Sequence, residues 1–341
     1  METIAWMSKK RKDGKVLCTA CSQRCVLKRG EIGKCGVRKV GEDGNLYLTV
    51  YGLASSYNVD PIEKKPLFHF LPSTPIFSIG TVGCNFCCKF CQNWEISQYP
   101  QTHNGKVFGV NLMPETIVNI CKTNSIPSIA YTYNEPVVFF EYAYDTMKLA
   151  KENGIKNVFV SSGYETKEAL ETVSPYLDAM NIDLKAFSDE FYRNISCARL
   201  KPVLKTIEHA KNLGIWIELT TLIIPGYNDD EKELKEAARW IASLDKNIPW
   251  HISRFFPAYK MMNVPPTPVE TLKKAYEIGK EVGLNYVYVG NLDDEDREST
   301  YCPSCGYRVI DRRGHIGQFV INHLKDGKCP HCGTEIAGVW S

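Results

Sequence analysis

Twelve of the fourteen cysteines fall into three groups, and this distribution divides the chain into three parts. In a chain of 341 residues, grouped cysteines indicate bound metal rather than a disulfide framework. Segments as short as the two ends seldom bury enough apolar surface to fold unaided, so we expect metal to hold them together. The groups are Cys18, Cys21, Cys25 and Cys35; Cys84, Cys87, Cys88 and Cys91; and Cys302, Cys305, Cys329 and Cys332.

The middle of the chain alternates continuous apolar runs with amphipathic segments. Runs such as NVFVSS and AMNIDL are typical of parallel strands that helices cover on both faces. This alternation predicts an α/β fold, namely a partial (β/α)6 TIM-like barrel. A flat doubly wound sheet is the alternative, but no glycine-rich dinucleotide fingerprint follows the first strand. The predicted strands are 76–82, 128–133, 157–161, 179–184, 215–223, 249–254 and 286–289, and the predicted helices are 114–123, 137–152, 167–173, 202–212, 231–244 and 268–282.

Three domains follow from these patterns. We expect an N-terminal cysteine-rich module over residues 1–60, the partial barrel over 61–295 and a zinc-ribbon-like module over 296–341. The net charge of +2 gives no whole-chain electrostatic reason to expect nucleic acid or an anionic membrane as a partner. The chain starts without a signal-peptide pattern and has no apolar run near the ~20 residues of a membrane span. We therefore expect a cytoplasmic protein, because thiols stay reduced there.

The second cysteine group, CNFCCKFC, directly follows the first predicted strand, at the end of the barrel where active sites lie. Cys84, Cys88 and Cys91 form C-x3-C-x2-C, with the aromatic Phe90 before the last cysteine. This spacing resembles the signature of the radical S-adenosylmethionine (SAM) superfamily. The resemblance implies a [4Fe-4S] cluster held by three thiolates, with one iron left open for SAM. It also implies reductive cleavage of SAM and hydrogen abstraction by a 5′-deoxyadenosyl radical.

The additional cysteine in this group, Cys87, departs from that signature. With Cys87, the segment also reads as two adjacent CxxC pairs, as in a zinc knuckle. However, four ligands within eight residues would crowd one ion, and a fourth thiolate would block the open iron. We predict that Cys87 is not a cluster ligand.

Polar residues follow several predicted strands and form a predicted SAM site. Asn134 and Glu135 stand where the superfamily has its Gly-Gly-Glu motif for the SAM amino group, although both glycines are absent here. The same residues also fit a helix start, with Asn134 as the cap. The predicted cofactor-binding residues are Asn134, Glu135, Ser162, Asp183, Lys185, Thr221 and His251.

Two of these predictions have a structural alternative. Asp183 and Lys185 alternate along one strand and therefore point to the same side. The pair resembles residues of the pyruvate formate-lyase activating enzyme near the SAM ribose and the substrate, but a buried structural ion pair is the alternative. His251 stacks on or hydrogen-bonds to adenine in the first interpretation, and is a hydrogen-bonded core histidine in the second.

The resemblance extends over nearly the whole chain. It matches the radical SAM component of the AmmeMemoRadiSam system, a relative of the glycyl-radical activating enzymes. This implies an oxidoreductase that uses an electron donor such as flavodoxin or ferredoxin and is associated with AMMECR-type and Memo-type proteins. The motifs that carry it are C-x2-C-x3-C-x9-C-G-V-R, CQNWEISQ, YTYNEP, NIDLKAF, HISRFFP and CGTEIAGVW.

The two outer cysteine groups differ in spacing. Cys302, Cys305, Cys329 and Cys332 form two CPxCG knuckles, a pattern that predicts a four-thiolate zinc ribbon. The spacing C-x2-C-x3-C-x9-C of Cys18, Cys21, Cys25 and Cys35 fits either zinc or an auxiliary iron–sulfur cluster. The small size of this module slightly favours zinc.

Three functions fit the sequence. The first is a radical SAM enzyme that abstracts hydrogen from a protein or peptide, as glycyl-radical activating enzymes do. The second keeps the SAM and the cluster but acts on a small aromatic or amino-acid-like molecule. The third is a non-catalytic metal-binding scaffold.

Overall fold

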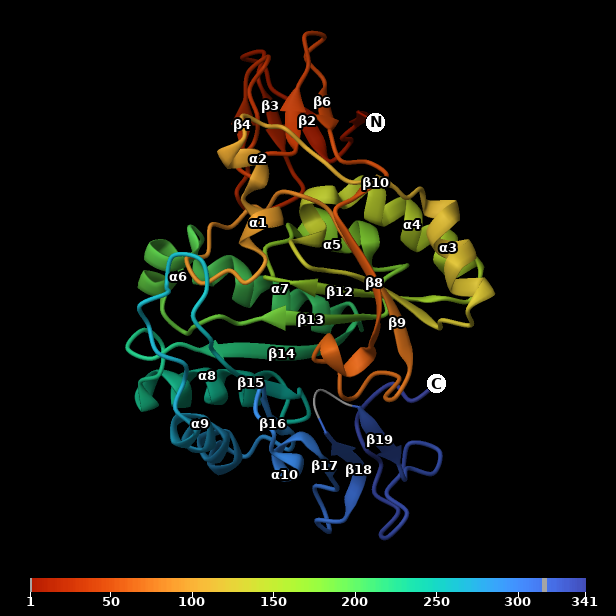
Figure 1. Cartoon of the computed structure of the whole chain (residues 1–341), viewed down its shortest axis with the longest axis vertical. Helices are drawn as coiled ribbons and strands as arrows, with labels where there is room; N and C mark the ends of the chain where they lie inside the picture. The colour runs from red at the N-terminus through yellow and green to blue at the C-terminus, as the bar shows by residue number, and fades with distance from the viewer. Residues whose placement is uncertain (1, 315–317) are drawn as a thin grey trace.

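The computed structural model describes residues 2–314 and 318–341. Three parts follow one another along the longest axis of the molecule (Figure 1). The N-terminal cysteine-rich module lies at one end, the large parallel sheet in the middle and the C-terminal module at the other end. One small cysteine-rich module therefore lies at each end of the molecule, with the central sheet between them.

The central sheet has eight strands in the order β16-β15-β14-β13-β12-β11-β9-β8. All neighbours from β9 to β16 are parallel, and β8 pairs antiparallel with β9. The strands follow one another across the sheet without the reversal of order that defines a doubly wound fold. The predicted α/β fold is confirmed. The bounds are β8 Ser56–Pro61, β9 Pro75–Gly80, β11 Ser128–Tyr131, β12 Lys156–Ser161, β13 Ala179–Asp183, β14 Trp216–Ile223, β15 Trp250–Arg254 and β16 Val287–Gly290.

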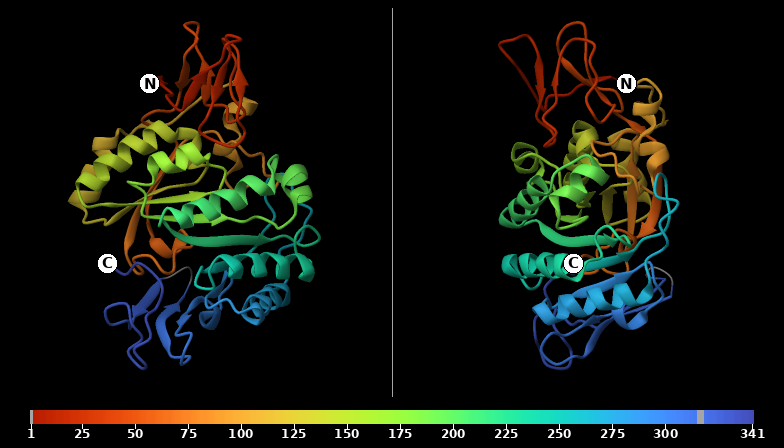
Figure 2. Two further views of the ribbon diagram at one scale, coloured as in Figure 1. Left: turned by 180° about the vertical axis from the view of Figure 1, so that it is seen from behind. Right: turned by 90° about the vertical axis from the view of Figure 1, so that its left-hand side faces the viewer.

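The helices that connect these strands lie on one side of the sheet (Figure 2). Each helix buries an apolar stripe; in α8, Leu234, Ala238 and Ile241 recur at helical spacing and are buried. All six predicted helices are present, and the predicted helix 137–152 begins with a 3-10 turn, η2 (Pro136–Phe139). The bounds are α3 Pro114–Thr123, α4 Phe140–Glu152, α5 Lys167–Val173, α7 Leu200–Asn212, α8 Glu231–Leu244 and α9 Val269–Val282.

One helix of two turns was not predicted from the sequence. This helix, α6 (Asp189–Ser196), starts at Ser188, whose Oγ accepts a hydrogen bond from the Phe191 amide. A serine cap followed by acidic residues is a helix-start signal, so the sequence did contain this information. The remaining short helices are η1 Ile62–Lys64, α1 Trp94–Ser97, α2 Tyr99–Thr102 and α10 Glu295–Glu298.

The N-terminal module consists of two three-stranded sheets, β1-β6-β5 and β2-β3-β4. A buried ion pair joins it to the barrel, with Arg38 Nη2 2.5 Å from Glu141 Oε2 on α4. The Arg38 Nε also donates to the Val138 carbonyl. The module is thus packed firmly on the first barrel helices. Its strands are β1 Thr3–Ile4, β2 Ser8–Lys10, β3 Val16–Cys18, β4 Val26–Leu27, β5 Arg38–Val40 and β6 Leu46–Leu48, and β7 Leu53–Ala54 pairs with β10 Val110–Asn111.

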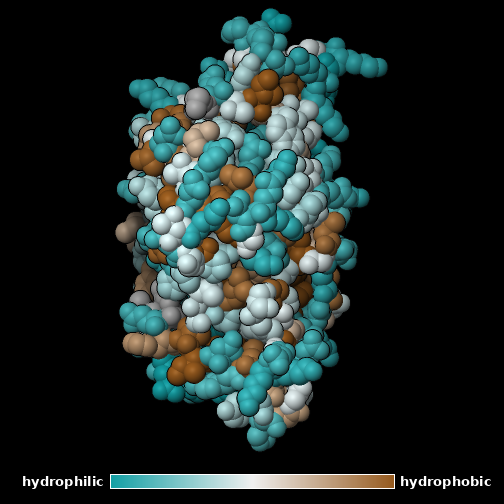
Figure 3. Space-filling model, turned by 90° about the vertical axis from the view of Figure 1, so that its right-hand side faces the viewer, coloured by the Kyte–Doolittle hydropathy of each residue, from teal (hydrophilic) through white to brown (hydrophobic). Residues whose placement is uncertain are grey.

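The C-terminal module is a three-stranded antiparallel sheet of β17 (Thr300–Tyr301), β18 (Arg308–Arg313) and β19 (Phe319–Asn322). Its buried Arg312 donates to the Phe68 carbonyl at 2.6 Å, with the guanidinium 4.1 Å from the Phe68 ring centroid. The face in Figure 3 carries hydrophobic residues in small groups between hydrophilic ones. Within residues 2–314 and 318–341, none of the helices has the length and apolar character needed to span a bilayer.

Candidate functional site

The loop after β9 carries the central cysteine group, and side-chain amides hold it in place. Gln98 Nε2 donates to the Phe86 carbonyl at 3.0 Å, and Gln101 Nε2 donates to the Cys84 carbonyl at 3.1 Å. Gln98 lies between the short helices α1 and α2, and Gln101 lies on α2, so the segment folds back onto its own loop. These two side chains therefore help to fix the shape of the loop.

Three thiols of this loop are wholly or partly shielded from solvent. Cys84 and Cys88 are buried and Cys91 is partly buried. Burial raises the pKa of all three thiols, and the charges of Cys88 and Cys91 further raise the pKa of Cys84. Deprotonating several buried, neighbouring thiols costs free energy because the thiolates are desolvated and repel one another. A bound metal offsets this cost, so such thiols are suited to a shared metal centre. The donor set fits the expected four-iron cluster.

Cys87 faces another element. It forms a disulfide with Cys197 at the end of α6, and its amide donates to the Ser196 carbonyl. A sulfur bonded to Cys197 cannot ligate a cluster. This agrees with the prediction that Cys87 is not a ligand.

A cavity of about 460 Å³ opens at the carboxyl ends of the parallel strands, next to the cysteine loop. This volume lies within the usual range of small-molecule sites. Four of the predicted SAM-binding residues line it: Asn134, Ser162, Asp183 and His251. The sequence prediction did not include further polar lining residues, among them Asn93, Thr132, Thr220, Ser253 and Asn291. Thr132, Ser253 and Asn291 lie at or just after strand ends, which was the signal that could have identified them.

Asp183 and Lys185 form an ion pair beside the cysteine loop. Lys185 Nζ is 2.7 Å from Asp183 Oδ2 and 5.8 Å from the Phe90 ring centroid. Burial alone would lower the pKa of Lys185, but the Asp183 carboxylate and the Cys88 thiol raise it. Lys185 therefore stays cationic near the thiols, and Asp183 faces the cavity.

Glu135 is fully buried behind the cavity wall. It accepts hydrogen bonds from Ser161 Oγ at 2.6 Å and from the Ser162 amide at 2.9 Å. Ser161 Oγ also lies 2.6 Å from Glu165 Oε1, and one hydroxyl proton cannot serve two carboxylates, so one carboxyl group is protonated. Burial and the Glu165 charge raise the pKa of Glu135 to about 8.

His251 and Thr221 lie on neighbouring strands but face different surroundings. His251 borders the cavity, and its Nε2 is 2.7 Å from Glu218 Oε2. Thr221 is not among the cavity-lining residues; its Oγ1 donates to the Leu184 carbonyl and accepts from Trp250 Nε1. Thr220, the preceding residue, borders the cavity instead.

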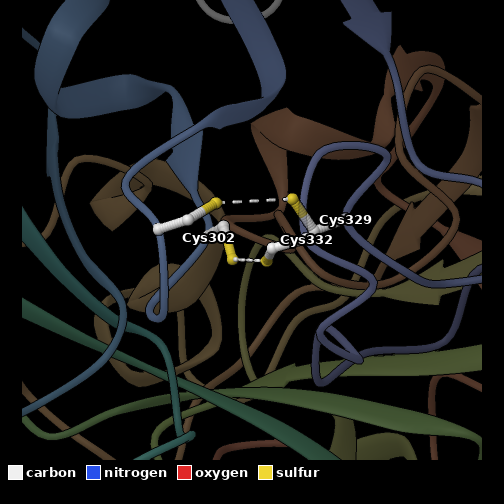
Figure 4. Close-up of side chains that lie close together, drawn as sticks. Cys302, Cys329 and Cys332 are labelled. Carbon is white, nitrogen blue, oxygen red and sulfur yellow. Dashed lines mark hydrogen bonds between the residues drawn. The ribbon is translucent and has the colours of Figure 1, made fainter.

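The C-terminal cysteines form a compact group of four sulfurs (Figure 4). The Sγ atoms of Cys302 and Cys332 are 3.5 Å apart, and those of Cys305 and Cys329 are 3.8 Å apart. Each knuckle turns at a glycine of positive φ, Gly306 or Gly333, whose amide donates to the carbonyl of the first cysteine. A tetrahedral zinc site with Zn–S bonds of about 2.3 Å requires sulfurs about 3.8 Å apart. The geometry fits one zinc ion.

The N-terminal cysteines also lie together. Cys18, Cys21, Cys25 and Cys35 line one small cavity beneath the β2-β3-β4 sheet. Burial raises the pKa of Cys21 most, and the charges of Cys18 and Cys35 raise it further. The chain therefore holds three separate thiol sites.

Comparison with known proteins identifies the central domain. The Radical SAM superfamily matches residues 78–241. The chain is 43% identical to an uncharacterised protein of Methanocaldococcus jannaschii, over 97% of this chain and 98% of the relative. It is 23% identical to a putative glycyl-radical enzyme activating enzyme of the same organism, over 61% of this chain and 76% of the relative. A radical SAM methyltransferase structure from Sphaerobacter thermophilus aligns with a TM-score of 0.50 and 14% identity, over 65% of this chain and 68% of the other.

Proposed function

Because this chain belongs to the radical SAM superfamily, we propose that Cys84, Cys88 and Cys91 hold its [4Fe-4S] cluster and that SAM occupies the adjacent cavity. When bound, the cluster supplies the electron that cleaves SAM and yields the 5′-deoxyadenosyl radical. The observation that carries this proposal is the cavity of about 460 Å³ at the carboxyl ends of the parallel strands, which is bordered by Gln92 and Asn93 directly after Cys91. The disulfide partner of Cys87 supports it, because only three thiols remain for the cluster.

We propose distinct roles for the cavity-lining residues. Asp183 accepts hydrogen bonds from SAM hydroxyls, and Lys185 holds the Asp183 carboxylate in place while offsetting the negative charge of the thiolates. Ser162 and Asn134 line the side of the cavity nearest the cysteine loop, where the amino and carboxylate groups of SAM would lie. His251, held by Glu218, contacts the adenosine part.

Glu135 needs a different role from the one that the superfamily motif suggests. It is fully buried and bonded to Ser161 and Ser162, which themselves line the cavity. We propose that Glu135 acts as a positioning residue that orients the Ser161–Ser162 backbone for SAM. Thr221 supports the strand through Leu184 and Trp250.

The reaction proposed is hydrogen abstraction from a protein or peptide, as in glycyl-radical activation. The relative that is a putative glycyl-radical enzyme activating enzyme supports this class. The whole-chain resemblance to the AmmeMemoRadiSam component supports AMMECR-type and Memo-type partners, a flavodoxin or ferredoxin donor and a cytoplasmic location. The compact sulfurs of the C-terminal quartet support zinc there.

The deciding experiment measures SAM cleavage by the anaerobically purified full chain. With a strong reductant, we expect 5′-deoxyadenosine to form, and deuterium from a labelled candidate substrate protein to enter it. Cys88→Ala should abolish cleavage, while Cys121→Ala, at a buried thiol outside the three groups, should retain it. If the wild type holds only zinc and leaves SAM intact, the proposal is wrong.

A further inference from the structure

Four thiols near the N-terminus, three of them buried, remain without a defined metal. Cys18, Cys21, Cys25 and Cys35 lie within one module and line one cavity, and their spacing in the sequence fits either zinc or iron–sulfur. The chain itself provides two reference sites. The C-terminal quartet has the geometry of a single zinc ion, and the central triad has the signature of a four-iron cluster.

The distances between the thiols distinguish the C-terminal quartet from the central triad. In the described part of the chain, the C-terminal quartet is the one set of three or more potential ligands whose atoms all lie within 4.8 Å of one another. By the same measure, no three thiols of the described N-terminal quartet come that close, and neither do Cys84, Cys88 and Cys91. A four-iron cluster places irons and sulfides between its thiolates, so its ligands lie farther apart than those around one ion. The N-terminal quartet therefore resembles the central triad.

The cavity between the N-terminal thiols supports the same conclusion. It offers about 10 Å³ to the centre of a water-sized sphere and is bordered by all four cysteines. A space that admits such a sphere keeps the sulfurs farther from its centre than the Zn–S bond of about 2.3 Å. Lys34 also borders this cavity and can offset part of the charge of the thiolates.

A buried amide without a partner faces this cavity. Asn85 is 3% exposed, and its Nδ2 makes no hydrogen bond to the residues that the structure describes. Its side chain borders the same cavity as Cys21 and the other three cysteines. Hydrogen bonds to sulfur are one of the means by which a protein sets the potential of an iron–sulfur cluster. An inorganic sulfide or a bound thiolate would give this orphan donor an acceptor.

Asn85 also connects the N-terminal quartet with the central triad. It follows Cys84 directly, its Oδ1 lies 3.8 Å from Cys84 Sγ, and its carbonyl accepts from Gln23 Nε2 at 2.9 Å. The loops approach so closely that a Cβ at Gly83 would lie 2.5 Å from the Cys35 carbonyl oxygen. The two thiol sites are neighbours, separated by one side chain.

We propose that Cys18, Cys21, Cys25 and Cys35 bind a second [4Fe-4S] cluster, and that Asn85 Nδ2 donates a hydrogen bond to one of its sulfurs. This proposal rests on the proposed function in two places: the central triad serves as the four-iron reference, and the wild-type iron count includes the central cluster. The triple variant tests the N-terminal module without either. It chooses the iron–sulfur alternative, whereas the sequence slightly favoured zinc. The C-terminal quartet keeps the single zinc ion.

The test uses the full chain with Cys84, Cys88 and Cys91 all replaced by alanine, purified anaerobically. The proposal expects this variant to keep about four irons and four sulfides, with the Mössbauer spectrum of a four-iron cluster, and one zinc. Adding Cys302→Ser and Cys305→Ser should remove the zinc and leave the iron. Adding Cys18→Ser and Cys21→Ser instead should remove the iron and leave the zinc. Two zinc ions and no iron in the triple variant would overturn the proposal.

Two further measurements keep the test independent of variant folding and of SAM chemistry. The intact wild type should contain about eight irons and one zinc, whereas about four irons and two zincs would contradict the proposal. In the triple variant, Asn85→Leu should retain the iron and shift the cluster midpoint potential to more negative values, because a lost N–H···S bond destabilises the reduced form. An unchanged potential would remove Asn85 from the proposal. Failure of SAM cleavage would leave all these results unaffected.

Discussion

Lys185 Nζ lies 2.7 Å from Asp183 Oδ2, at the carboxyl end of β13 and beside the central cysteine loop. The pair is asymmetric, since the lysine side chain is 9% exposed and the aspartate side chain 37% exposed. The lysine thus anchors a carboxylate that borders the cavity. This relationship makes the pair a site feature as well as a structural ion pair.

Lys185→Met should reduce SAM cleavage at least about tenfold, equivalent to about 1.4 kcal/mol, while iron content stays at the wild-type level. Removing the buried cation leaves Asp183 without its partner and the thiolates without a neighbouring positive charge. Rates of 5′-deoxyadenosine formation and iron assays measure both effects. Lys167→Met, at a side chain 72% exposed, is the matched control. Wild-type cleavage by the Lys185 variant would contradict the assigned role.

Replacing Cys87 and Cys197 together by serine should leave both iron content and SAM cleavage near wild type. The two sulfurs bond to each other and lie outside the cluster ligand set. The substitution should lower the thermal unfolding midpoint, because the link ties the cysteine loop to α6 across 110 residues. Cys91→Ser provides the contrast and should lose the central cluster. Loss of SAM cleavage in the double variant would mean that Cys87 is a ligand.

The buried carboxyl pair Glu135 and Glu165 should make stability fall as pH rises. The pKa of Glu135 is raised from the ordinary 4.5 to about 8 by burial and by Glu165, so the folded chain binds more protons than the unfolded chain between these values. Stability from this pair is therefore full below about pH 4.5 and is lost on approaching pH 8. The apparent Tm, measured at one scan rate across this pH range, reports the change in stability. Glu165→Gln should flatten the profile, and an unchanged slope would exclude the pair as its cause.

Neighbouring threonines on β14 should respond differently to valine. Thr221→Val leaves Trp250 Nε1 without an acceptor and should cost about 1–3 kcal/mol of unfolding free energy, with unchanged SAM affinity. Thr220→Val should weaken SAM binding several-fold, because Thr220 borders the cavity. Equilibrium dialysis with labelled SAM and thermal unfolding separate the two effects. If Thr221→Val weakened SAM binding and Thr220→Val did not, Thr221 rather than Thr220 would be the residue that contacts SAM.

Cys305→Ser should remove one zinc ion per chain and loosen the C-terminal module. The four sulfurs join the two knuckles, and the small apolar cluster beneath them includes Val309, Ile310 and Ile336. Limited proteolysis should then cut the module while the barrel stays intact. Zinc analysis with a chromogenic chelator supplies the count. An unchanged zinc content would show that the quartet does not hold it.

The sequence by itself determined the central architecture. Continuous apolar runs alternating with amphipathic segments located the seven parallel strands and the six longer helices, because burial on two faces leaves a local signature in each segment. The cysteine spacing also indicated the proposed cluster loop and the two knuckles. The helix α6 was missed although its serine cap was visible in the sequence.

Only the tertiary structure decided which groups meet. Spacing could not reveal that Cys87 pairs with Cys197, that Glu135 shares Ser161 with Glu165, or that Thr220 rather than Thr221 borders the cavity. Such contacts depend on strand register and on which way each side chain faces, and these follow from packing between distant segments. The same holds for the N-terminal thiols, because only the fold brings all four to the border of one cavity.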